Sequence, residues 1–259
     1  MNSLLTAIWA ELLKVRRSRV VWLTWLAFSF LPLMAGFFMI LLQNPGLVSG
    51  GMMNEKAKLL TGKADWISFI GLITQGVAVG GLLVFGFLTS WIFGREYADH
   101  TLKDLLALPM ARSTIMLAKF IVVSGVCLLL LAAIVLEGFL IGKWLHLAVW
   151  PGNAWLASLM LLVKTAGLTI LLSFPAALLA TIGRGYLAPI GFVVLTLVLA
   201  QIIAAAGLGS YFPWAVPGLN TGMAGSVAIP RVSFLLVWLT GLAGFVSTVL
   251  WCQYADFDK

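Results

Sequence analysis

Long apolar runs separated by short polar stretches dominate this chain of 259 residues. A helix needs about 20 apolar residues to cross a hydrocarbon core of about 30 Å, and six runs reach that length. None of them alternates like a membrane β-strand, and backbone polar groups in lipid must be satisfied within each segment. The pattern therefore predicts an all-α integral membrane protein with one transmembrane domain over 1–259 and spans at about 20–42, 66–93, 114–141, 154–182, 187–207 and 232–252.

Composition supports a lipid-facing surface. The chain is 62% hydrophobic and 10% charged, whereas a soluble domain carries roughly 25% charged residues. The first apolar run begins at Val20 and is longer than the apolar region of a signal peptide. We therefore expect this run to be a membrane span rather than a cleaved leader.

Basic residues predict the orientation, because Lys and Arg are enriched on the cytoplasmic side. Both termini are expected inside, which places the larger basic group in the cytoplasm and leaves Lys164 within a span. The net charge of +7 then favours contact with anionic membrane lipid. The basic residues flank spans instead of forming one patch, so no nucleic-acid partner is expected. The cytoplasmic group is Lys14, Arg16, Arg17, Arg19, Arg95, Lys103, Arg112, Lys119, Arg184 and Lys259, and the outer group is Lys56, Lys58, Lys63, Lys143 and Arg231.

Residues 3–13 are predicted to form an amphipathic helix at the membrane interface. Leu4, Ile8 and Leu12 repeat at helical spacing, and Glu11 lies away from that stripe. Such a helix rests in the headgroup layer. The helix is either a plain anchor or a lever that responds to a cytoplasmic partner. The expected anchoring residues are Trp9, Lys14, Arg16, Arg17 and Arg19.

The segment 208–231 is nearly uncharged and rich in aromatic residues, Pro and Gly. This composition does not suit another regular spanning helix. Irregular backbone is tolerated at membrane depth only where protein buries it. We therefore expect an external hairpin of short, re-entrant helices before the last span.

The most polar stretch lies between the second and third spans, at 95–112. Thr101 is placed to cap a helix with Asp104 three residues later. Leu102 and Leu105 then share one face, and Pro109 ends the helix. A helix of about two turns is not stable alone in water. It must therefore pack on the ends of its own spans or on a soluble partner.

The sequence from Phe93 to Arg112, followed by Lys119, resembles the E…G/H-T-L…L…P-x-x-R…K segment of type 2 ABC exporter permeases, and most of all the bacitracin-resistance and lantibiotic-immunity type. The stretches beginning at Gly185 and Tyr211 are also similar to that group. The resemblance implies a coupling helix that docks on an ATP-binding-cassette ATPase. The corresponding residues are Glu96, Thr101, Leu102, Asp104, Leu105, Leu106, Leu108 and Pro109.

The same resemblance implies a bacterial cytoplasmic-membrane exporter. Two copies of the ATPase would bind ATP and Mg, and a second permease copy or a related permease would complete the pathway. The substrate would be an amphipathic peptide, an antibiotic or a lipid-like molecule.

Several catalytic signatures are absent from the sequence. It has no G-x-x-x-x-G-K-[ST], so no nucleotide hydrolysis is expected here. His100 and His146 lie apart from any cluster with ligand spacing, so no metal site is expected. The chain is therefore predicted to be non-catalytic, with no cofactor of its own.

Two charges fall within predicted spans, Glu137 near the outer end of the third and Lys164 near the middle of the fourth. A central charge costs about 2.5–3.5 kcal/mol on insertion scales. The two residues could pair and fix the helix register, or they could line a translocation path. An ion-coupled secondary transporter, or a membrane sensor or scaffold that transports nothing, is the alternative reading of the whole chain.

Overall fold

The structure is a computed structural model that describes residues 3–44, 64–101, 110–147, 152, 154–223 and 229–254. Across these ranges all regular structure is helical, and no strand occurs. Six helices in the described part of the chain are long and apolar enough to cross a membrane. This agrees with the predicted all-α class and with the number of spans. The six are α2 (Arg19–Gln43), α4 (Trp66–Ala98), α6 (Arg112–Trp144), α7 (Ala154–Ile182), α8 (Leu187–Ala205) and α10 (Arg231–Tyr254).

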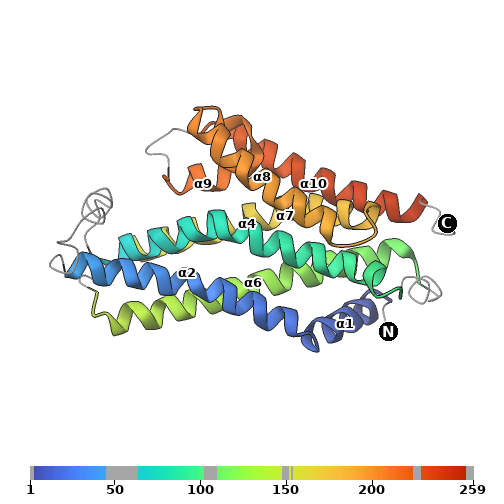
Figure 1. The fold of residues 1–259 in the computed structure, drawn as a ribbon, viewed down its shortest axis with the longest axis horizontal. Helices are drawn as coiled ribbons and strands as arrows, with labels where there is room; N and C mark the ends of the chain where they lie inside the picture. Colours follow the sequence, from blue (N-terminus) through green and yellow to red (C-terminus); the bar gives the residue numbers. More distant parts are fainter. Residues whose placement is uncertain are drawn as a thin grey trace.

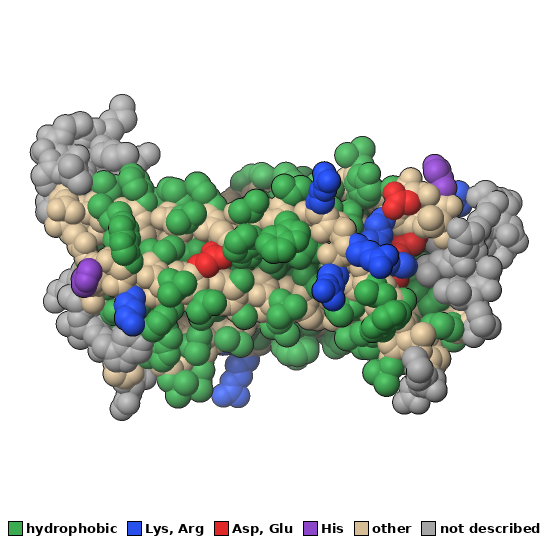
Figure 2. All heavy atoms as spheres, turned by 90° about the horizontal axis from the view of Figure 1, so that it is seen from below, with side chains coloured by type: hydrophobic (Ala, Val, Ile, Leu, Met, Phe, Trp, Pro, Cys, Tyr) green, Lys and Arg blue, Asp and Glu red, His purple; other side chains and the backbone are tan. Residues whose placement is uncertain are grey.

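The long helices run side by side along the longest axis, and both termini lie at the same end (Figure 1). The largest interface joins α4 to α7, and α10 packs on α7. Helices α2 and α6 pack on each other and on α4. Most charged side chains visible in Figure 2 gather toward one end, whereas apolar side chains cover the middle. That distribution suits a bundle whose middle lies in lipid.

Glycines allow several of these helices to approach closely. A Cβ on Gly244 of α10 would lie 2.5 Å from the backbone nitrogen of Pro175 in α7. A Cβ on Gly76 or Gly80 of α4 would lie 3.0 or 3.4 Å from the side chain of Leu31 in α2. The Gly76-x-x-x-Gly80 pattern is therefore used for packing within this chain.

A short helix, α1 (Ser3–Arg16), precedes the first long one and packs mainly on α6. The buried face of α1 carries Ala7, Glu11 and Val15. The sequence placed Glu11 away from the apolar stripe, and the structure shows that the face carrying Glu11 is packed against the protein. Leu5 and Trp9 are exposed instead. These two exposed side chains are available to contact lipid.

Three short helices precede α10: η2 (Gly209–Tyr211), η3 (Pro213–Ala215) and α9 (Val216–Asn220). Val216 is fully buried in a cluster with Leu82 of α4, Leu172 of α7 and Val237 of α10. Short helices were expected in this part of 208–231. Their burial against long helices meets the physical condition for irregular backbone at membrane depth.

Candidate functional site: a buried ion network joining α1, α4 and α6

A buried network of two carboxylates and two ammonium groups joins α1, α4 and α6 at one end of the bundle. Lys119 Nζ on α6 donates to Glu96 Oε1 on α4 at 2.7 Å and to Glu11 Oε2 on α1 at 3.2 Å. Its third hydrogen bond goes to the backbone oxygen of Ile92 at 3.1 Å. All three donors of the ammonium group are thus used. We refer to Glu11, Lys14, Glu96 and Lys119 as the ion network.

Lys14 completes the network from the same face of α1. Its Nζ donates to Glu11 Oε1 at 2.6 Å and to Glu96 Oε1 at 3.2 Å. Glu11, Glu96 and Lys119 are only 2%, 3% and 1% exposed. Charges so far from water are stable only when they are paired and hydrogen-bonded. With two negative and two positive groups, the network meets that requirement by neutralising itself.

One oxygen in the network lacks a partner. Glu96 Oε2 is buried, and no group in the described ranges donates a hydrogen bond to it. Arg95 approaches only the other oxygen, Oε1, at 3.8 Å. An unsatisfied buried oxygen costs about 1–3 kcal/mol, so Glu96 is held in place by its partners despite this cost.

The backbone at the end of α4 closes in a defined cap next to Glu96. His100 adopts a left-handed conformation with φ of 57°. Its N–H donates to the Tyr97 oxygen at 3.4 Å, and the Thr101 N–H donates to the Glu96 oxygen at 3.0 Å. This pair of bonds is the Schellman motif, which fixes the direction in which the chain leaves a helix. The motif therefore sets the entry into residues 102–109.

The predicted coupling residues have different outcomes. Leu102, Asp104, Leu105, Leu106, Leu108 and Pro109 lie outside the described residues. Thr101 is exposed. Glu96 is buried in the ion network, so its side chain does not present a surface to a soluble partner.

The predicted anchor residues differ in how exposed they are. Trp9, Arg16, Arg17 and Arg19 are exposed, as an interfacial role requires. Lys14 is different, because its ammonium group bonds to two buried carboxylates. The structure thus places Lys14 inside the protein's own charge network rather than free for lipid headgroups.

Glu137 and Lys164 have separate partners. Glu137 accepts a hydrogen bond of 3.0 Å from Ser29 Oγ on α2. Lys164 Nζ lies 4.1 Å from the ring centroid of Phe234 on α10. No ion pair joins the two among the residues that the structure describes. Of the two alternatives that the sequence left open, the structure therefore does not contain the ion pair between Glu137 and Lys164.

The polar residues that follow Lys164 on α7 serve helix contacts. Ser173 Oγ accepts a hydrogen bond of 3.0 Å from Thr89 Oγ1 on α4. Thr165 Oγ1 accepts one of 3.3 Å from the side-chain nitrogen of Asn220 on α9. Both hydroxyl-bearing residues on α7 are buried. These hydrogen bonds join α7 to α4 and to α9.

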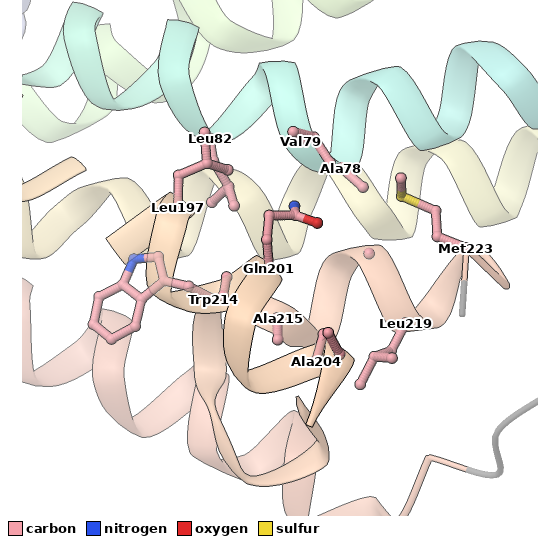
Figure 3. Close-up of a pocket in the computed structure, with 13 residues that line it drawn as sticks. Ala78, Val79, Leu82, Leu197, Gln201, Ala204, Trp214, Ala215, Leu219 and Met223 are labelled. Carbon is pink, nitrogen blue, oxygen red and sulfur yellow. The ribbon is translucent and has the colours of Figure 1, made fainter. Parts of the chain in front are cut away.

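At the opposite end from the ion network, a cavity of about 220 Å³ separates α4 and α8 from the short helices. Figure 3 shows Gln201 of α8 pointing into the space between α8 and α4, with Trp214 and Met223 at its sides. Trp214 is held by ring contacts to Phe192 and Phe212. The cavity is mainly apolar and carries one amide. Such a lining suits an apolar group with one polar contact.

The described part of the chain contains no candidate metal site. No group of three or more His, Cys, Asp and Glu side chains there could hold a metal ion. The charged groups that do come together are two carboxylates and two lysines, which neutralise one another.

Six apolar helices of spanning length define a multi-pass α-helical membrane protein. Residues 7–202 match the family described as "ABC-2 family transporter protein". The chain therefore belongs to the ABC-2 family of transporters, and it is a multi-pass protein of a bacterial membrane. It is also 26% identical over 180 residues to the bacitracin transport permease protein BCRB of Bacillus licheniformis. That match covers 68% of this chain and 85% of the relative.

Proposed function

We propose that this chain is the membrane subunit of an ATP-driven exporter that is powered by a separate ATP-binding subunit. Family membership supports the transporter class. The ion network supports the coupling mechanism, because it lies where α4 ends and α6 begins, on either side of residues 102–109. In the proposed orientation this end of the bundle faces the cytoplasm.

In this proposal the ion network carries a push on residues 102–109 into the spans. Glu96 lies near the last turn of α4, and Lys119 lies two turns into α6. Their 2.7 Å ion pair couples the two helices that flank the segment. Separating buried opposite charges is costly because the surroundings have a low dielectric constant. The two helix ends should therefore move together when a partner displaces the segment.

The proposed substrate is an amphipathic peptide, an antibiotic or a lipid-like molecule. The relative from Bacillus licheniformis is named for bacitracin transport. The mainly apolar cavity of about 220 Å³ beneath the short helices supports a cargo with an apolar portion. We also propose that two copies of the permease, or this chain with a related one, work with two ATPase copies.

The coupling proposal is tested by placing charge in residues 102–109. Leu105→Asp should leave the chain in the membrane but remove the co-purifying ATPase, because a carboxylate in an apolar contact loses its hydration. Leu187→Asp is the matched control, since Leu187 is exposed at the start of α8, at the same end of the bundle. Both variants are purified in mild detergent and assayed for ATPase content and ATP hydrolysis.

Retention of the ATPase and of full hydrolysis by Leu105→Asp would contradict the proposed docking. Loss in both variants would mean that the added charge acts non-specifically. Gel filtration of each variant separates loss of the partner from loss of the fold.

A further inference from the structure

A crevice of about 540 Å³ lies beside the ion network, between the start of α2 and the start of α8. Its floor is one stripe of α4, formed by Phe87, Trp91 and Arg95 at intervals of four residues. Tyr186 borders it on the α8 side, and Arg17 lies near the start of α2. The crevice is distinct from the apolar cavity at the other end of the bundle.

The stripe on α4 changes character along the helix in the same order as a phospholipid. Phe87 is apolar and lies deepest along the span, Trp91 follows one turn later, and Arg95 lies close to the helix end. Trp residues favour the interface between hydrocarbon and headgroups. The Arg95 guanidinium lies 4.9 Å from the Trp91 ring centroid, which holds the cation over the aromatic face.

The charge balance of the crevice favours an anion. The ion network is neutral within itself, because Glu11 and Glu96 offset Lys14 and Lys119. Arg17, Arg95 and Asp99 also line the crevice, and two positive charges against one negative leave an excess of one positive charge. Arg17 is exposed and has no ion-pair partner in the described ranges. Its guanidinium is the group most available to a ligand.

The first turn of α2 adds to this preference. Ser18 and Val20 line the crevice, and Ser18 caps the helix by accepting the Val20 N–H at 3.0 Å. The remaining N–H groups of a first helical turn have no partner within the helix and favour negative charge. They support the site that the arginines define.

We infer that this crevice binds the headgroup of an anionic phospholipid, with its phosphate at Arg17 and Arg95 and an acyl chain along Trp91 and Phe87. The singly charged phosphodiester of phosphatidylglycerol matches the excess of one positive charge. Lys14 borders the crevice and also bonds to Glu96, so lipid in the crevice lies against the ion network. The inference does not depend on the ATPase partner.

The test uses the full-length chain in mild detergent, titrated with phosphatidylglycerol and followed by native mass spectrometry. Arg17→Gln and Arg95→Gln should each weaken binding about fivefold, the effect expected from one basic contact at a membrane surface. Arg19→Gln is the matched control, because Arg19 is exposed two residues from Arg17 but does not line the crevice. Phosphatidylcholine with the same acyl chains should bind more weakly than phosphatidylglycerol.

Three outcomes would overturn the inference. An equal loss in Arg19→Gln would mean that diffuse surface charge attracts the lipid. Equal binding of phosphatidylcholine and phosphatidylglycerol would show that the crevice does not recognise the charge of the headgroup. Displacement of the lipid by inorganic phosphate alone would identify a site for a free anion. Arg17→Gln removes no ion pair described in the structure and should retain its fold, which gel filtration checks.

Discussion

Replacing Lys119 with methionine should destabilise the protein by about 3–5 kcal/mol, the cost of removing one partner from a buried ion pair. Lys119 is 1% exposed and provides three hydrogen bonds, two of them to carboxylates. After the substitution, Glu11 and Glu96 keep the ammonium group of Lys14, whose side chain is 36% exposed, and the more distant guanidinium of Arg95, 3.8 Å from Glu96 Oε1. Both buried carboxylates then lose the one cation that is itself fully buried.

A second substitution separates the charge effect from lost packing. Adding Glu96→Gln to Lys119→Met removes the carboxylate that loses its closest cation and leaves Glu11 paired with Lys14 at 2.6 Å. The double variant should therefore be more stable than the sum of the two single effects predicts, by roughly 1–3 kcal/mol. Lys164→Met is the control, because that exposed lysine loses only a cation–π contact, worth about 0.5–1 kcal/mol.

The assay is equilibrium unfolding of the purified chain in mixed micelles with increasing dodecyl sulfate. The 11 tryptophans of the chain provide the fluorescence signal. If Lys119→Met costs no more than Lys164→Met, the network does not stabilise the fold as its burial implies. Strictly additive single effects would show that Lys119 and Glu96 do not interact.

Three further predictions follow from the geometry. Gly94→Ala should lower the melting temperature, because its Cβ would lie 2.8 Å from the backbone of Gly185; an unchanged melting curve would contradict that contact. His100→Gly should stabilise the end of α4 by about 1 kcal/mol, since glycine adopts φ of 57° without strain; a thermal shift in the folded chain checks this. Glu137→Gln and Lys164→Met should destabilise additively in the unfolding assay, because their partners differ.

The spans were predictable because apolar run length is a direct property of the sequence. All six predicted stretches coincide with long helices, and the largest difference is at α4, which continues to Ala98 instead of ending near 93. The extension covers Arg95 and Glu96, which composition assigns to a loop. These charges remain helical because they are paired or stacked at the end of the bundle.

The ion network was not predictable from helical periodicity. Glu11 and Lys119 are 108 residues apart, and their contact depends on how α1 lies against α6. A stripe pattern reports which face is apolar, but it does not report which polar residue is buried with a partner. The sequence did offer one signal of burial, because Glu11 and Lys119 are each a single charge among apolar neighbours. The partners of Glu137 and Lys164 were missed for the same reason, since Ser29 and Phe234 lie on helices distant in sequence.

The two readings of the N-terminal helix, anchor or lever, can be weighed from its contacts. Although α2 follows α1 directly, α1 packs far more extensively on α6. Glu11 and Lys14 also bind it to Lys119 of α6 and Glu96 of α4, both beside residues 102–109. A helix held by buried charges moves with its partners, since opening those pairs in a low dielectric is costly. Helix α1 should therefore follow α4 and α6 when the segment between them is displaced, which favours the lever.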